Sequence, residues 1–542
     1  MLSKPGRLTA AVQLACAAAL ASPMNVIAAN NFAEHAETTT PIKHVIVIFN
    51  ENISFDHYFG TYPYATNPKG EPPFHAKDDT PRVNNLIGGG LLDQNPNSTQ
   101  PFRMDTGVAS VTCDQNHSYG PEQAATDHGL MDKFPQAVGS GSSSNSPCND
   151  YGKGPGVVMG YFDGNTVTAL WNYAQHYAMS DNSYGTTFGP STVGALNLIA
   201  GTTTTATLVP LKPNGQPGNP VGAIAGGAAS GAAIGDPRPG GDECVLTSPG
   251  LQGATMITVS GRNVGDLLNA KQLTWGWFQG GFAPTGYDSQ GRAICGAHHA
   301  GLAGDDLKTT VGDYIPHHEP FQYYKSTQNL HHVLPKDPAL IGTSLDGANH
   351  QYDLSAFWTA LGEDRLPAVS YVKPAAWADG HPGYSDPIDE QQFIVNVVNA
   401  IQNSPYWKNT AIVIAYDDSD GWYDHVLGPI VNQSAVSDDA FAGPGNCGSG
   451  TSGTQGRCGY GPRLPLLVIS PFAKQNYVDH RTTDQASILR FIEDNWELGR
   501  IGGDSSDAKA GSLMGMFDFD DEHRAGRLIL DPATGVVLSQ HY

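Results

Sequence analysis

Short apolar runs alternate with stretches of helical spacing along most of the chain. Residues 43–49 (KHVIVIF) and 411–415 (AIVIA) are apolar and partly β-branched, and they predict strands buried on both faces of a parallel sheet. Further runs with strand character are 273–278, 366–374 and 465–471. Helical spacing marks the ranges 167–180, 353–361, 389–403 and 483–496. Because helices lead into strands, the pattern predicts an α/β fold with a large, mostly parallel, doubly wound sheet flanked by helices.

Both buried strands end in side chains that carry oxygen. Glu51 and Asn52 follow the first strand, and Asp417 and Asp418 follow the second. Open α/β sheets bind ligands beyond the carboxyl ends of their strands, and adjacent buried carboxylates repel each other unless a cation joins them. An all-oxygen set favours Mg²⁺, Ca²⁺ or Mn²⁺, with Zn²⁺ less suited. The alternatives are a polar loop that caps the next helix and an Asp/Gly-rich turn with its carboxylates in water.

The two strand ends lie far apart in the sequence, so one large domain has to bring them together. We therefore expect a single α/β domain over about 41–500, with loop-rich insertions near 74–150, 211–242 and 290–312. The Gly/Ala/Pro-rich segment 211–242 predicts a flexible surface loop, and it is a poor phosphate loop because no Lys-Ser/Thr follows its glycines. Residues 501–542 should pack on the same domain as a tail.

Ser191 follows Gly189-Pro190, which ends the preceding segment, and falls at the predicted cap of a helix that starts near Thr192. An ordinary N-cap serine is one interpretation. The other interpretation is a serine at a phosphate-binding site. A helix N-terminus offers free N–H groups and a positive dipole end to a phosphate. A serine placed there beside a metal could ionise and attack phosphorus.

Three long motifs resemble a known family. They are IKHVIVIFNENISFDHYFGTYP, FGPSTVGALNLIAGTT, and AYDDSDGWYDHV followed by GYGPRLPLLVISPFAK. In this order they are similar to the bacterial phosphoesterase family, which holds acid phosphatase A and the phosphatidylcholine-type phospholipases C within the alkaline-phosphatase-like superfamily. The resemblance runs from about Pro41 to about Trp496. It implies a serine or threonine nucleophile in the second motif, with Ser191 as the candidate and Thr192 as the second choice.

The resemblance also implies active-site roles for four histidines. His117 would bind a phosphoryl oxygen, and a surface loop histidine is the alternative. His317 and His318 match active-site histidines of the acid phosphatases, although adjacent residues reach one site only through a turn. His381, on the loop after a predicted strand, is a further candidate, with a loop histidine that caps a carbonyl as the alternative. His425 is expected to be structural or to lie behind the site.

One departure from the resembled family bears on the substrate. The phospholipase branch tends to have Pro-Asn-Arg soon after the nucleophile, whereas this chain has Val193-Gly194-Ala195. We therefore expect an acid phosphatase that acts on phosphomonoesters through a phosphoserine, with at least one oxygen-liganded divalent metal ion. Imidazolium donors, with an unperturbed pKa of about 6.5, would fit an acid optimum. The alternatives are a phospholipase C, with phospholipid as substrate, and a non-catalytic exported protein that binds metal or phosphate.

Residues 1–29 have the parts of a secretory signal peptide. Lys4 and Arg7 precede the small, apolar stretch 10–21, and Ala28-Ala29 offers a cleavage site. The apolar stretch is too short for a confident membrane span, and no other stretch approaches the roughly 18 apolar residues that a span needs. We expect an exported protein, periplasmic or secreted, without stable membrane insertion. An uncleaved anchor is the alternative.

Cysteine content and charge agree with export. Six cysteines remain after the predicted signal peptide, which suggests three disulfides, with free buried thiols as the alternative. Fifteen connectivities are open, and pairing of sequence neighbours (113–148, 244–295 and 447–458) is our choice among them. No Cys/His spacing indicates zinc. With 29 Lys and Arg against 52 Asp and Glu, the net charge of −23 argues against a nucleic-acid partner.

Overall fold

Eight strands form the central sheet, in the order β16-β11-β17-β1-β18-β19-β4-β20. The computed structural model describes residues 1, 32–105, 112–139, 150–209, 224–225, 230–251, 254–300, 311–434, 436, 438–441, 447, 455–520 and 524–541. The strands are β1 (His44–Asn50), β4 (Ala178–Ser180), β11 (Trp275–Gln279), β16 (Gln351–Asp353), β17 (Val369–Lys373), β18 (Thr410–Tyr416), β19 (Leu466–Ile469) and β20 (Tyr477–Asp479). All neighbours pair in parallel except at β19, which runs antiparallel to both β18 and β4. The predicted mostly parallel sheet is therefore confirmed.

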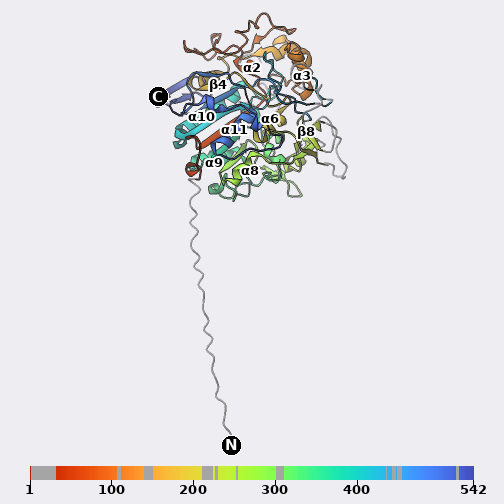
Figure 1. The fold of residues 1–542 in the computed structure, drawn as a ribbon, viewed down its shortest axis with the longest axis vertical. Helices are drawn as coiled ribbons and strands as arrows, with labels where there is room; N and C mark the ends of the chain where they lie inside the picture. Colours follow the sequence, from red (N-terminus) through yellow and green to blue (C-terminus); the bar gives the residue numbers. More distant parts are fainter. Residues whose placement is uncertain are drawn as a thin grey trace.

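The two runs that anchor the sequence pattern lie side by side in the middle of this sheet. Strand β1 pairs with β18 in parallel from His44↔Thr410 to Asn50↔Tyr416, and every residue of both strands is buried. In Figure 1, β1 is the red-orange strand among cyan and blue ones. Because the strands are in register and parallel, the residues that follow Asn50 and Tyr416 emerge at the same edge.

Helices flank the sheet and match the predicted ranges closely (Figure 1). The longer ones are α5 (Thr168–His176), α6 (Ser191–Ala200), α9 (Leu354–Gly362), α10 (Pro387–Asn403) and α11 (Gln485–Asn495). Asp353, Asp386 and Asp484 cap three of these helices through their carboxylates. The shorter ones are α1 (Phe32–His35), α2 (Phe55–Phe59), α3 (Tyr119–Ala125), α4 (Phe134–Ala137), α7 (Glu243–Thr247) and α8 (Val264–Ala270).

Two predicted boundaries are wrong. Ser191 is the first residue of α6, because Pro190, in an extended conformation, occupies the cap position. Helical spacing over 167–180 continues past the real end of α5 at His176, and residues 178–180 form β4. There the tertiary pairing of β4 between β19 and β20 overrides the local pattern.

Part of the Gly/Ala/Pro-rich segment is ordered, contrary to the prediction of a flexible surface loop. Strands β8 (Ser230–Ala233) and β9 (Arg238–Pro239) join a five-stranded sheet in the order β7-β8-β6-β10-β9. The other strands of this sheet are β6 (Ala206–Leu208), β7 (Ile224–Ala225) and β10 (Met256–Val259). The small side chains of Ala232 and Ala233 are fully buried. A Gly/Ala-rich composition can therefore reflect close packing here as well as chain flexibility. Residues 210–223 lie outside the described part.

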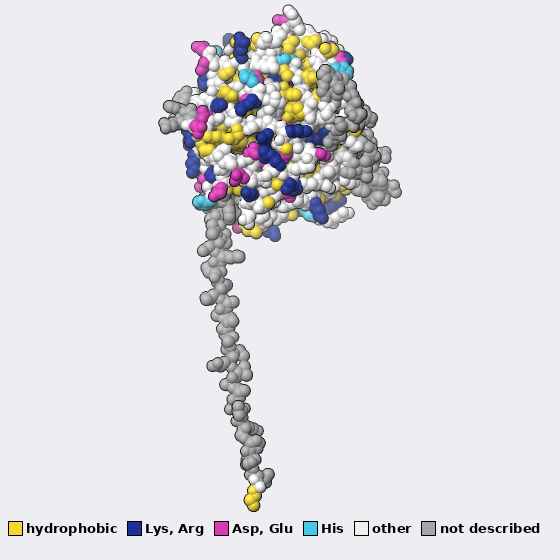
Figure 2. Space-filling view, viewed as in Figure 1, with side chains coloured by type: hydrophobic (Ala, Val, Ile, Leu, Met, Phe, Trp, Pro, Cys, Tyr) yellow, Lys and Arg dark blue, Asp and Glu magenta, His cyan; other side chains and the backbone are white. Residues whose placement is uncertain are grey.

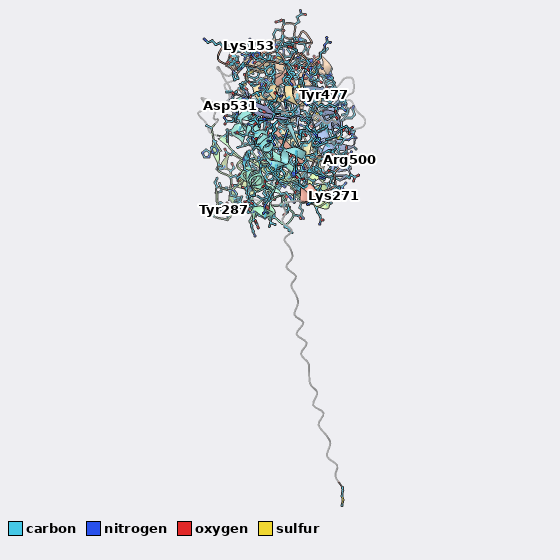
Figure 3. All side chains as sticks on the ribbon, turned by 90° about the vertical axis from the view of Figure 1, so that its left-hand side faces the viewer. Lys153, Lys271, Tyr287, Tyr477, Arg500 and Asp531 are labelled. Atoms are coloured by element: carbon cyan, nitrogen blue, oxygen red, sulfur yellow. A yellow bond between two sulfur atoms is a disulfide. The ribbon has the colours of Figure 1, made fainter. Side chains whose placement is uncertain are left out.

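The remaining strands are short pairs. They are β2 (Phe102–Arg103), β3 (Gly160–Tyr161), β5 (Ser183–Tyr184), β12 (Gly286–Tyr287), β13 (Ala293–Ile294), β14 (His298–His299), β15 (Val311–Gly312), β21 (Thr483–Asp484), β22 (Arg527–Leu530) and β23 (Val537–His541). The β22–β23 hairpin belongs to the predicted tail, and α10 binds its backbone through Asn399 and Gln402. In Figure 3, Lys153, just after the first predicted insertion, lies at the top of the folded part, and Lys271, after α8, lies toward its bottom.

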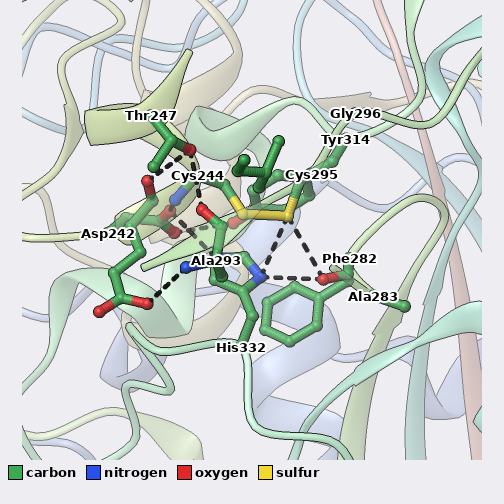
Figure 4. The surroundings of a disulfide bond; sticks show 12 residues. Asp242, Cys244, Thr247, Phe282, Ala283, Ala293, Cys295, Gly296, Tyr314 and His332 are labelled. Atoms are coloured by element: carbon green, nitrogen blue, oxygen red, sulfur yellow. Dashed lines mark hydrogen bonds and ion pairs between the residues drawn. A yellow bond between two sulfur atoms is a disulfide. The ribbon is translucent and has the colours of Figure 1, made fainter. Parts of the chain in front are cut away.

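Two of the three predicted disulfides are present. Cys244 on α7 joins Cys295 (Figure 4), and Cys447 joins Cys458. Cys148 and residues 2–29 of the predicted signal peptide lie outside the described residues. Two disulfides indicate an oxidising compartment.

Among the described residues, no helix has the length and apolar character to cross a membrane. Acidic and basic side chains are interspersed over the face shown in Figure 2.

Candidate active site

The two predicted strand ends meet at the edge of the sheet. The Asp417 Oδ1 atom accepts hydrogen bonds from the backbone N–H groups of Asn52 (2.9 Å) and Asp418 (2.7 Å). The Glu51, Asn52, Asp417 and Asp418 side chains are all buried, none more than 4% exposed. Asn52 adopts a positive φ of 63°, a conformation that asparagine tolerates better than most residues. The side chains at the two strand ends therefore form one cluster of oxygens, as the sequence predicts.

Three oxygens of this cluster are suited to a cation. Glu51 Oε2, Asn52 Oδ1 and Asp417 Oδ2 are buried and have no hydrogen-bond partner among the described atoms. Burial raises the pKa of Glu51 and of Asp418 well above the ordinary range, and the nearby Asp417 carboxylate raises both further. Orphaned oxygens and crowded carboxylates are what a divalent cation would satisfy. The residues present fit such an ion, and buried acidic and histidine groups at this edge could hold it.

A lysine that the sequence analysis missed lies in the same cluster. Lys373, the last residue of β17, is fully buried and bonds Glu51 Oε1 through its ammonium group. His318 Nδ1 lies 3.1 Å from the same oxygen. Burial alone would lower the pKa of Lys373, but the Glu51, Asp417 and Asp379 carboxylates raise it above its ordinary value. A fixed positive charge therefore neutralises part of the carboxylate cluster on the β17 side.

Ser191 lies opposite the strand ends. Its Oγ atom donates to Asp418 Oδ2 at 3.3 Å, and it occupies the first turn of α6, where backbone N–H groups are free of helical partners. One of these groups, Thr192 N–H, is bound by Asp236 Oδ1 at 3.0 Å. The predicted nucleophile and predicted metal ligands are thus in direct contact, at the positive end of a helix.

A glycine permits this contact. A Cβ atom at Gly194 would lie 2.0 Å from the backbone oxygen of Asp417 and 2.9 Å from its Cα. Since both obstacles are backbone, neither can rotate away. Any larger residue at this position would force the start of α6 away from the end of β18, and with it Ser191 away from Asp418.

Gly194→Ala should therefore separate the serine from the carboxylates. We expect a loss of about 1–3 kcal/mol in the free energy of unfolding from overpacking, and a fall in kcat/KM of roughly 100-fold from displacement of reacting groups. Chemical denaturation and steady-state kinetics would measure the two effects. Gly362→Ala in α9 is the matched control, because nothing lies within 4 Å of its Cβ position. Full activity in Gly194→Ala would show that the contact between Ser191 and Asp418 is not needed for activity.

The four predicted histidines take different places. His117 lies 3.2 Å from Asp420 Oδ1, and Asp420 also accepts from the Asn52 amide at 3.0 Å. His381 is 6.1 Å from His117, ring to ring. His317 and His318 lie in the 3₁₀ turn Pro316–His318. A turn is what two adjacent histidines need if both are to approach one site. His318 packs behind the site against Glu51, whereas the other three line the open cavity.

The cavity above Ser191 has a volume of about 550 Å³. Its described polar and aromatic lining residues are Asp114, Gln115, His117, Ser118, Ser191, Asp236, Arg238, Ser248, Tyr314, His317, His381 and Tyr384. Burial alone would lower the pKa of His117, but Asp418, Asp420 and Asp114 raise it well above its ordinary value. The cavity thus offers a hydroxyl group, imidazoles and a guanidinium group to an anionic ligand. Asp114, His117, His381 and Asp420 also bring their ligand atoms within 4.8 Å of one another.

His425 lies in a separate buried network. Its Nδ1 is 2.6 Å from Asp56 Oδ2, and Arg463 binds both Asp56 and Asp424. This network ties α2 to the segment after β18. The expected structural role of His425 agrees with these contacts.

Four residues at the candidate site were missed from the sequence, and the local signals that could have indicated them differ. Lys373 ends a predicted strand, so the rule that singled out Glu51 and Asp417 would have found it at a third strand end. Asp420 stands within the motif already quoted. Asp236 and Arg238 stand in the Gly/Ala/Pro-rich segment, and no local signal separates them from loop residues.

Comparisons with known proteins find a family and several relatives. Residues 42–499 match the family described as the Phosphoesterase family. The non-hemolytic phospholipase C of Pseudomonas aeruginosa is 24% identical over 476 residues, which are 83% of this chain and 53% of that protein. Phospholipase C B of Mycobacterium tuberculosis is 23% identical over 84% of this chain and 73% of its own. The chain spans about half the length of the Pseudomonas relative.

A solved structure from Vibrio parahaemolyticus, of a protein in the alkaline phosphatase superfamily, is also similar. It is 10% identical, covers 82% of each chain and superposes with a TM-score of 0.27.

Proposed function

The chain belongs to the Phosphoesterase family, and from that premise we propose that it is an exported acid phosphatase that cleaves phosphomonoesters through a phosphoserine on Ser191. The observation that supports this proposal best is the position of Ser191. Its hydroxyl group lies at the positive end of α6, within hydrogen-bond distance of Asp418, and opens into a polar cavity. A serine so placed is suited to attack a phosphoryl group.

Glu51, Asn52, Asp417 and Asp418 would hold a divalent metal ion together with Ser191, and oxygen ligands favour Mg²⁺, Ca²⁺ or Mn²⁺ over Zn²⁺. When bound, the metal would lower the free energy needed to ionise the serine hydroxyl and would stabilise charge on the phosphoryl oxygens. The three orphaned oxygens of Glu51, Asn52 and Asp417 support this assignment.

The chain's own groups would then perform two displacements. Ser191 gives its hydroxyl proton to Asp418, to which it already donates a hydrogen bond, and its Oγ attacks phosphorus in line. The bond to the leaving alkoxide breaks, and a cavity histidine protonates the alkoxide. His117, held by Asp420, and His317 and His381 face the cavity and can contact the phosphoryl oxygens. His318 contributes from behind by orienting Glu51. Water then attacks the phosphoserine from the vacated side, which frees Ser191 and releases phosphate.

Two substrates with the same leaving group test the proposed function. We expect kcat/KM for p-nitrophenyl phosphate to exceed that for p-nitrophenyl phosphorylcholine by at least about tenfold, because the cavity offers a cation and imidazole donors to a dianion. Release of p-nitrophenolate measures both reactions. A preference for the choline diester would replace the phosphatase assignment by a phospholipase C.

A phospholipase C is the second candidate because the relatives from Pseudomonas aeruginosa and Mycobacterium tuberculosis have that name. It would act on phospholipid, and release of diacylglycerol from phosphatidylcholine would identify it. The residues after Ser191 count against it, since Val193-Gly194-Ala195 differ from the pattern expected of that branch.

A further inference from the structure

Arg238 is held rigidly at the wall of the cavity. Its backbone N–H donates to Thr255 (2.7 Å), and Gly240 N–H donates to Ile257 (2.8 Å), which fixes β9 against β10. Immediately before it, the Pro237 carbonyl accepts from the Tyr323 hydroxyl group at 2.5 Å. The segment that carries Arg238 is therefore anchored on both sides, although its composition is typical of a loop.

The guanidinium group of Arg238 lacks an anionic partner. Its Nη1 atom is buried without a hydrogen bond, and no carboxylate among the described residues lies within ion-pair distance of it. Burial lowers the pKa of Arg238 below its ordinary value, although the nearby Asp236 opposes this effect. The side chain as a whole is partly exposed to the cavity, but a buried donor such as Nη1 is costly unless a ligand accepts its hydrogen bond. Arg238 is also the only arginine or lysine among the described residues that line the cavity.

The acidic groups of the cavity are already engaged. Asp236 Oδ1 accepts from Thr192 N–H at 3.0 Å, and Asp114 Oδ1 lies 3.5 Å from His117 Nδ1. Neither carboxylate therefore has to be matched by a cationic substrate. Arg238 is the charged lining group that still needs a partner of opposite sign.

The aromatic groups of the cavity are engaged as well. The ring of Tyr384 stacks on His381 at 4.3 Å, and Tyr314 packs against His332 while its hydroxyl group donates to Asp242 (Figure 4 shows Tyr314 and His332). Trimethylammonium groups are recognised by open aromatic faces. The described lining residues thus offer a free cation and no free aromatic cage.

We propose that Arg238 binds an oxygen of the substrate's phosphoryl dianion and so selects phosphomonoesters over phosphocholine diesters. This inference rests on the proposed function and names the residue that sets its substrate class. A monoester dianion presents a terminal oxygen that can accept from the guanidinium fork. A phosphocholine diester has one non-bridging oxygen fewer. If the esterified oxygen takes the position at Arg238, it offers a weaker acceptor, and the positive charge of the choline group repels the guanidinium group.

Substitution of Arg238 tests the proposal. Arg238→Met keeps much of the side-chain volume without charge, and Arg238→Lys keeps the charge without the fork. We expect the ratio of kcat/KM for p-nitrophenyl phosphate to that for p-nitrophenyl phosphorylcholine to fall by about 10- to 100-fold in Arg238→Met, with a smaller fall in Arg238→Lys. Inhibition by inorganic phosphate should weaken by a similar factor. Arg481→Gln, which removes an exposed arginine paired with Asp479, should leave the ratio unchanged.

The experiment tests the proposed function and the role of Arg238 independently of each other. The wild-type ratio reports the proposed function, and the change of the ratio on substitution reports the role of Arg238. A ratio that stays within about threefold of wild type in a folded Arg238→Met would overturn the inference, whichever substrate the wild type prefers. Should Arg238→Met not fold, the Lys variant decides by the same comparison of ratios and phosphate inhibition.

Discussion

Replacing Ser191 with alanine should lower kcat for phosphate-ester hydrolysis by at least about 10³-fold, since removal of a covalent nucleophile leaves only the contribution of binding and electrostatics. The substitution deletes one hydroxyl group, whose described hydrogen bond goes to Asp418 at 3.3 Å. The helix and its packing should therefore persist. Steady-state kinetics would measure the loss. Mass spectrometry of acid-quenched wild type should find a phosphoryl group on the peptide that contains Ser191.

Thr192→Ala provides the matched control, because Thr192 is the next hydroxyl residue on α6. We expect it to retain activity within about tenfold of wild type, since the lost group would not react. Comparable loss in both variants would point to a disturbed helix, and thermal melting would show it. Undiminished activity in Ser191→Ala would refute the assignment of the nucleophile. Wild-type protein without any hydrolytic activity would favour the non-catalytic alternative.

Asp417→Asn should cost the protein its metal ion and most of its activity. The Oδ1 atom of Asp417 accepts from two backbone N–H groups, and an asparagine oxygen can keep both bonds. The Oδ2 atom, buried without a partner, would become an amide nitrogen that cannot ligate a metal. We expect metal affinity and kcat/KM to fall by at least about 100-fold, more than removal of a group behind a ligand usually causes. Elemental analysis and kinetics would measure both.

The stability of Asp417→Asn separates this explanation from general disruption. The substitution removes a negative charge from a cluster that contains Glu51 and Asp418, so the metal-free variant should melt no lower than metal-free wild type. Chelation of the wild type should reproduce the loss of activity, and added metal should restore it only in the wild type. Asp288→Asn, at a partly exposed surface ion pair with Arg292, should keep the metal content and activity of wild type. Normal metal content in Asp417→Asn would show that the ligand set is wrong.

The central fold and half of the site could be predicted because their signals are local. Strands β1 and β18 are continuous apolar runs, and such runs occur where both faces of a strand are covered. Once they are parallel neighbours, Glu51, Asn52, Asp417 and Asp418 necessarily emerge at one edge. Gly189-Pro190 predicted a helix that starts near Thr192, with Ser191 at its cap. The helix in fact begins one residue earlier, at Ser191.

The remaining features depend on distant contacts. Residues 178–180 continue a helical pattern, yet they pair with strands nearly 300 residues later and so become β4. Arg238 stands in a segment whose composition predicts a loop, and only the pairing of β9 with β10 places it at the cavity. His318 contacts Glu51 across the fold, and no spacing rule connects the two residues. Lys373, by contrast, ends β17, so the strand-end rule would have included it.

The distance along the sequence between strands β1 and β18 also determines when, during synthesis, the site can form. The hydrogen bond between Asn52 and Asp417 spans 365 positions of the chain. At the usual 5–20 residues per second of synthesis, the ribosome needs roughly 20 to 70 s to make the second half of the site after the first. Between the synthesis of Ser191 and that of Asp417, the nascent chain holds the serine without Asp417 and Asp418. Until Asp417 and Asp418 have been made, the proposed reaction centre would therefore lack two of its proposed metal ligands.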